Sequence, residues 1–176
     1  MNFKIINKEN KESLREEFIK RFVNTEADHY KKYIATLKEY PDGMCYDGYL
    51  WDSLKADYKQ IERTMEQAIE YLKHKENVFV MWDIYSQHRV YDNSKLATNY
   101  PKDTVIETNS RELCKLVETE WGNYLIGDEN YLPEDIYIYD EKLNWYVIFT
   151  HEGYDSYTNP DLGEDEYIRI CFVHAL

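Results

Sequence analysis

The chain has 176 residues, a formal net charge of −13 and 18 tyrosines, but only 6 glycines and 4 prolines. Its length and its hydrophobic fraction of 43 % are typical of one globular domain, and its aromatic content excludes a disordered chain. The negative charge argues against direct binding to nucleic acid or to an anionic membrane, because both need a basic protein surface.

The ends and the cysteines of the chain indicate a cytoplasmic protein. The N-terminus lacks the apolar run of a signal peptide, and no stretch approaches the roughly 18 apolar residues of a membrane span. Three widely spaced cysteines, Cys45, Cys114 and Cys171, show no CxxC or Cys/His metal spacing, which is typical of reduced thiols. We expect a chain that begins at Met1 and holds no cofactor.

Residues 1–76 are predicted to be mainly helical. A first helix spans residues 10–22, and a second begins at Thr25 and ends at the Pro41-Asp42-Gly43 turn. The longest periodic run, residues 58–74, predicts a third helix, because its apolar residues recur every three to four positions.

Residues 77–176 are predicted to be mainly strand, with one short helix that Asn109 caps. Runs of β-branched and aromatic residues predict strands, which span residues 78–82, 104–107, 135–139, 143–149 and 167–173. Residues 151–166 are predicted to be a long loop. The whole chain, residues 1–176, is therefore predicted to be a single α+β domain. Its N-terminal helices pack on a mostly antiparallel sheet of four to five strands with a C-terminal hairpin.

The stretch from Glu118 to Glu166 carries fourteen acidic residues, one base, seven tyrosines and two tryptophans. Carboxylates attract a basic partner, and aromatic rings supply rigid contact area and faces for Arg or Lys. We expect Tyr137 and Tyr139 of the hairpin to face outward. If they face a second layer of core instead, the partner-binding surface is reduced to the turns and the loop. The candidate partner-binding residues are Tyr137, Tyr139, Asp140, Glu141, Tyr154, Asp155, Tyr157, Asp161, Glu164, Asp165 and Glu166.

No complete catalytic motif is present in the chain, because glycine-rich phosphate loops, the G-x-S-x-G elbow and H-E-x-x-H are all absent. His151-Glu152 is a possible general acid/base pair, and a structural contact at the entry to the loop is the alternative interpretation. Residues 155–166 match a calcium-binding EF-hand loop at its first, fifth and twelfth positions, but Tyr157 and Pro160 occupy two other key positions. We therefore assign no catalytic residue and no metal site.

The block from Asp135 to Glu152, DIYIYDEKLNWYVIFTHE, is similar to the C-terminal signature of small bacterial families of unknown function. In these families a strand, a short acidic turn, a Trp and a Thr-His-Glu follow one another, and Gly48-Tyr49-Leu50-Trp51 resembles the same group. Such proteins resemble the immunity proteins that are encoded beside bacterial toxins. The resemblance implies a bacterial cytosolic protein, and it carries over no catalytic residues.

We interpret the chain as a non-enzymatic acidic protein-binding domain, an immunity-type inhibitor that masks the basic surface of a toxin or nuclease. A second hypothesis, an inhibitor from a phage or mobile element that mimics nucleic acid against a defence nuclease, relies on the same physics. A third is a small hydrolase that uses His151-Glu152. The fourth is an acidic domain whose carboxylates form only a solvated rim.

Overall fold

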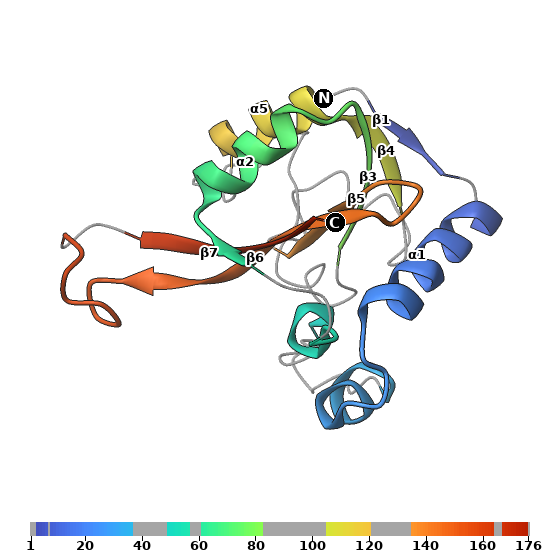
Figure 1. The fold of residues 1–176 in the computed structure, drawn as a ribbon, viewed down its shortest axis with the longest axis horizontal. Helices are drawn as coiled ribbons and strands as arrows, with labels where there is room; N and C mark the ends of the chain where they lie inside the picture. The colour runs from blue at the N-terminus through green and yellow to red at the C-terminus, as the bar shows by residue number, and fades with distance from the viewer. Residues whose placement is uncertain are drawn as a thin grey trace, which may run out of the picture.

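A single antiparallel sheet forms the centre of the computed structural model, which describes residues 3–6, 8–36, 49–56, 61–82, 105–120, 135–163 and 167–175. The sheet has seven strands in the order β1-β4-β3-β5-β6-β7-β2 (Figure 1). The strands are β1 (Phe3–Ile5), β2 (Ile61–Arg63), β3 (Asn77–Trp82), β4 (Ile106–Asn109), β5 (Ile136–Tyr139), β6 (Trp145–Asp155) and β7 (Tyr167–Ala175).

Helices cover both faces of this sheet, which gives three layers (Figure 1). The helices are α1 (Lys8–Phe22), the short π-helix η1 (Tyr30–Ile34), the 3₁₀-helix η2 (Leu50–Ser53), α2 (Met65–Lys73) and α5 (Ser110–Glu120). Helices α2 and α5 pack on one face, whereas α1 and η2 pack on the other. No helix within the described ranges is long and apolar enough to cross a membrane.

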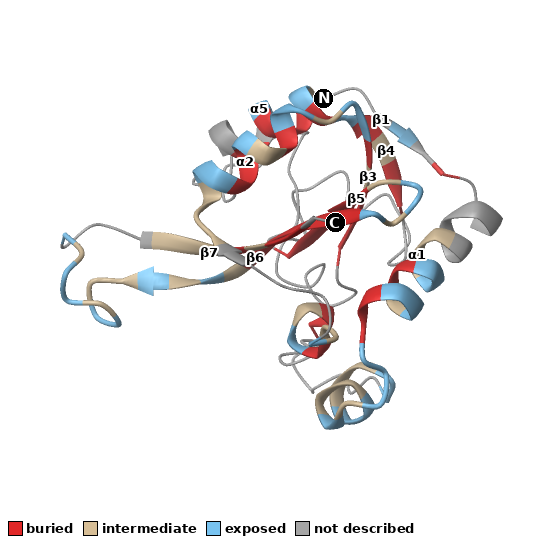
Figure 2. Cartoon of the chain, in the orientation of Figure 1, coloured by how far each residue is buried: buried red, intermediate tan, exposed pale blue. Residues whose placement is uncertain are grey.

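The alternation of side chains along β5 shows why both faces are covered. Ile136 and Ile138 point into the cluster formed with α2 and α5, and Tyr137 and Tyr139 point into the cluster formed with α1. All four side chains are fully buried, and the buried residues concentrate at this centre (Figure 2). A strand that is apolar on both faces needs a layer on each side, because exposed apolar area costs free energy.

The predicted α+β class with an antiparallel sheet is confirmed. The five predicted strands correspond to β3, β4, β5, β6 and β7, and two three-residue strands, β1 and β2, extend the sheet at its edges. The first helix and the short helix are also confirmed. Asn109 caps the latter, since its Oδ1 accepts a hydrogen bond from the Arg111 N–H at 3.0 Å.

The prediction of one helix over residues 58–74 is wrong in its first part. Residues 61–63 form β2, which pairs with β7, and α2 begins only at Met65. Thr64 separates the two elements: its backbone is extended, and its side chain forms a capping box with Gln67. The free edge of β7 supplies backbone partners, and this pairing overrides the helical periodicity of the sequence.

The second predicted helix is shorter than expected. Residues 30–34 form the single turn η1, and Thr25 lies in a turn before it rather than at a helix cap. Asn24 holds this turn, because its side-chain oxygen accepts a hydrogen bond from the Glu26 N–H at 3.1 Å. The turn at residues 41–43 that was expected to end the helix lies outside the described residues.

The first five residues of the predicted long loop, residues 151–155, are strand, whereas residues 156–163 form turns and irregular structure. β6 continues to Asp155 and pairs with β7 again from Gly153 to Asp155, so the two strands extend beyond the sheet as a ribbon (Figure 1). We call this ribbon and its tip, residues 153–163 and 167–169, the arm. At its base three residues, Thr150 to Glu152, lie opposite the single residue Ile170, which is a β-bulge.

Candidate functional site

The fold divides the acidic stretch of the sequence into two separate groups. Asp140 and Glu141 lie in the turn between β5 and β6, whereas Tyr154 and Asp161 belong to the arm (Figure 1). Tyr154 lies near the far end of β6, nine residues after Trp145, which corresponds to roughly 30 Å for a strand. The candidate residues therefore do not form one continuous patch.

The expectation that Tyr137 and Tyr139 face outward is wrong. Both side chains are fully buried under α1, with ring centroids 5.6 Å and 5.0 Å from that of Phe18. The Tyr137 hydroxyl accepts a hydrogen bond from the Trp51 N–H at 3.0 Å, and burial raises the pKa of Tyr139 far above its usual range. A partner that docks on the surface cannot touch either ring, and the surface is reduced to the turns and the arm.

Two of the candidate carboxylates stabilise turns. Asp140 accepts hydrogen bonds from the Asn144 N–H at 2.7 Å and the Asn144 side-chain amide at 2.9 Å. Asp155 accepts from the backbone N–H groups of Tyr157 at 3.0 Å and Thr158 at 2.9 Å. The backbone bond from Thr158 is the largest cause that lowers the pKa of Asp155. Both carboxylates are therefore hydrogen-bonded within their own turns.

The arm keeps the most exposed of the remaining candidates. Tyr157 is 93 % exposed and Tyr154 is 39 % exposed, and they are the only large hydrophobic side chains exposed among the described residues. Asp161 and Glu141 are also exposed. Glu164, Asp165 and Glu166 lie outside the described residues.

At the base of the arm, His151 is fixed by a buried carboxylate that the sequence did not indicate. Nδ1 of His151 lies 3.0 Å and 3.1 Å from the two oxygens of Asp135, and the His151 N–H donates to the same carboxylate at 3.1 Å. The indole N–H of Trp51 donates to Asp135 at 3.1 Å. Because a carboxylate only accepts, this arrangement places a hydrogen on Nδ1.

The second nitrogen of His151 faces a carboxylate that is open to solvent. Nε2 lies 3.2 Å from Glu152, whose side chain is 55 % exposed, while the side chain of Asp135 is 2 % exposed. The ring of Tyr49 lies 4.6 Å from the imidazole. Asp52 is a further carboxyl in these surroundings. Burial is the largest cause that raises its pKa; His29 lowers the pKa, and the negative charge of Glu152 raises it further.

Neither described cysteine has the character of a nucleophile. Cys114 and Cys171 are free and buried, and burial raises the pKa of the Cys171 thiol to about 12. Within the described ranges no group of three or more His, Cys, Asp or Glu side chains is arranged to hold a metal ion. Of the loop compared with an EF-hand, residues 155–163 form the tip of the arm.

Comparisons with protein-family models, with curated proteins and with solved structures find no match to this chain. The similarity of residues 135–152 to immunity-type families therefore stays a prediction, and the functional argument depends on the residues themselves.

Proposed function

We propose that this protein is a non-enzymatic acidic binding domain of the bacterial cytoplasm, and that it inhibits a basic toxin or nuclease by covering its surface. The observation that carries this proposal is the arm, which places an almost fully exposed tyrosine, Tyr157, at the end of a ribbon beyond the sheet. Tyrosine is enriched at protein interfaces, because its ring supplies rigid contact area and its hydroxyl group can form hydrogen bonds.

The charges of the molecule complement such a partner. Nucleases and many toxins that act on nucleic acid carry basic clefts, because they must bind phosphate. A net charge of −13 attracts a basic surface over several ångströms and raises the association rate. Tyr157 and Tyr154 then supply contact area with little loss of side-chain entropy, which is how tyrosine acts at interfaces.

The test is a pull-down with the full chain as bait from a lysate of its own organism, followed by inhibition assays on the purified partner. We expect one basic protein that is released at high salt and inhibited at a stoichiometric ratio. Tyr157→Ala should weaken its binding by about tenfold or more, which is the effect of a strong interface residue. Tyr157→Phe should retain binding, because the ring supplies the contact.

Asp161→Asn on the arm and Glu16→Gln on α1 form a matched pair for the charge contribution, because both remove one exposed carboxylate. Only the variant on the arm should slow association. Partner affinity that is independent of salt, or equal in the Tyr157→Ala variant and the parent, would contradict the proposal. An inhibitor that mimics nucleic acid would use the same surface and would differ only in its target, a defence nuclease.

A small hydrolase is a second candidate function, and the Asp135–His151 pair favours it. A buried carboxylate that orients an imidazole through Nδ1 is one part of the arrangement of a general base. In this case His151→Ala abolishes hydrolysis of an ester or phosphoester substrate, while Tyr157→Ala leaves the rate unchanged. The binding function predicts the opposite sensitivities, so the two variants separate the candidates.

A further inference from the structure

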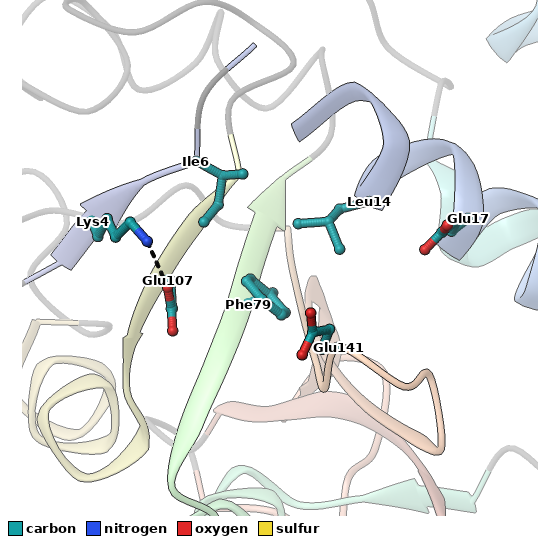
Figure 3. A pocket seen from close by; sticks show the side chains of 7 residues that line it. All are labelled: Lys4, Ile6, Leu14, Glu17, Phe79, Glu107 and Glu141. Carbon is teal, nitrogen blue, oxygen red and sulfur yellow. Dashed lines mark ion pairs between the residues drawn. The ribbon is translucent and has the colours of Figure 1, made fainter. Parts of the chain in front are cut away.

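A pocket of about 440 Å³ lies on the side of the sheet that α1 covers, at the end opposite the arm (Figures 1 and 3). It lies where β1, β4 and β3 meet α1 and the turn between β5 and β6. Its volume is in the usual range for sites that bind small groups. The residues that line it are Lys4, Ile6, Leu14, Glu17, Phe79, Glu107 and Glu141.

Three of the residues that line the pocket are apolar. Ile6 is buried, and Leu14 and Phe79 are half-buried members of the cluster beneath α1. Figure 3 shows these three side chains between the acidic groups. Such a lining suits an aliphatic chain, because burying each methylene group is favourable.

The rim of the pocket is acidic. Glu17 comes from α1, Glu107 from β4 and Glu141 from the turn after β5, so three separate elements bring their carboxylates to one opening (Figure 3). Lys4 pairs with Glu107 at 3.6 Å. Glu17 and Glu141 are both exposed, so the residues that line the pocket include three carboxylates and one lysine.

We infer that this pocket binds an alkylammonium group, and that in the complex this group is a lysine side chain of the basic partner. The inference rests on the proposed function and names one contact within it. An aliphatic stem fits against Leu14 and Phe79, while the ammonium group meets Glu17 and Glu141. Anions are repelled by the same rim, and a neutral chain gains nothing from the carboxylates. Lysine matches this combination, because it buries its stem and keeps its charged end at the surface.

The first test uses n-butylammonium chloride as the probe in an NMR titration of the full chain, with n-butanol as the neutral control. We expect amide shifts around Leu14, Phe79 and Glu107 with a dissociation constant in the millimolar range, about 1–10 mM for so small a group. The neutral alcohol should leave these amides unchanged at the same concentration. Absent shifts, or equal shifts with the alcohol, would overturn the inference.

The variant Glu17→Gln/Glu141→Gln tests the role of the rim, and Glu16→Gln/Glu66→Gln is its matched control. Both remove two exposed carboxylates, but Glu16 and Glu66 do not line the pocket. The first should weaken binding of the probe by about fivefold, and the second by less than about twofold. Equal weakening in both would show that only the net charge matters, and the inference would then be wrong.

The affinity of the basic partner for the same two variants distinguishes the inference from the proposed function. If the partner binds both variants as it binds the parent, the lysine contact is wrong while the binding function stands. If butylammonium binds at the pocket but no basic partner exists, the pocket remains an alkylammonium site and the proposed function is wrong. A partner that loses at least about fivefold in affinity with the pocket variant alone supports both.

Discussion

Asp52 is the residue whose titration is most altered by the surroundings of His151. Burial is the largest cause of its raised pKa, the nearby His29 opposes it, and the negative charges of Glu152 and Asp135 add to it. The native protein therefore holds the proton of Asp52 more firmly than the unfolded chain does. This contribution to stability is present at low pH and is lost as the pH rises through the native pKa.

Asp52→Asn is therefore expected to stabilise the protein near neutral pH and to have little effect in acid. The melting temperature should rise by about 1–3 °C at about pH 8, because the side chain is partly exposed and solvent screens the effect. At about pH 3 the difference should shrink towards zero, since Asp52 is then largely neutral in both the native and the unfolded chain. Thermal melts at the two pH values measure it, with Asp161→Asn as the exposed control. A difference that grows in acid would contradict the assignment.

The sequence allowed His151 to be recognised as a candidate, but not its partner. Asp135 lies 16 residues earlier, and only the pairing of β5 with β6 brings the two together. The register gives the reason: Ile136 pairs with Phe149, so Asp135 reaches the start of the bulge. A hairpin prediction extended by one pair would have suggested this contact. The hydrogen bond from Trp51 to Asp135 could not have been predicted from the sequence, because it depends on packing between segments that are far apart in the chain.

At the scale of elements, the turn between β5 and β6 depends on Asp140. Its carboxylate accepts three hydrogen bonds, two from Asn144 and one from the Trp145 N–H at 3.4 Å. Leu143 adopts a left-handed backbone conformation with φ of 53°, which is uncommon for a residue other than glycine. The carboxylate therefore supports a turn whose backbone alone is unfavourable.

Asp140→Ala should consequently lower the free energy of unfolding by about 1–2 kcal/mol, as expected for the loss of several hydrogen bonds to a charged group. Glu141→Ala is the matched control, because it removes the adjacent carboxylate, which is exposed and lines the pocket instead. It should change stability by less than about 0.5 kcal/mol. Urea unfolding of the two variants provides the comparison. Similar losses in both would mean that charge, and not the hydrogen bonds of Asp140, stabilises the turn.

The elements that the sequence predicted well are those whose local signals agree with their surroundings. The hairpin of β5 and β6 combines aromatic and β-branched runs with a polar turn, and both strands lie in the middle of the sheet. Residues 61–63 show the opposite case, because their helical periodicity is overridden by the edge of β7. Residues 151–155 were predicted as part of a loop, because the turn residues that follow them gave no sign of a pairing with residues 167–169 that resumes after the bulge.

At the scale of the whole molecule, the net charge of −13 is a source of internal repulsion. Surface ion pairs such as Lys4–Glu107 compensate little of it, because solvent screens exposed pairs. Added salt weakens both effects, but the acidic residues outnumber the basic ones, at 34 against 21. Repulsion should therefore decide how stability responds to ionic strength.

We expect the melting temperature to rise by about 3–5 °C between roughly 0.02 M and 0.5 M NaCl, as the Debye length falls. KCl should produce the same rise, which identifies screening as the cause rather than binding of one ion. Differential scanning calorimetry at a fixed pH measures the change. A constant or falling melting temperature would show that ion pairs outweigh repulsion in this fold.

The arm and the centre of the sheet are expected to open on different timescales. A ribbon of two strands is marginal by itself, whereas β5 is enclosed on both faces and opens only when the whole sheet does. Backbone amides of residues 153–155 therefore exchange with deuterated water long before those of β5. A protein seated on Tyr157 slows this exchange at the arm, so the pattern of deuterium uptake locates this part of the interface before any complex has been crystallised.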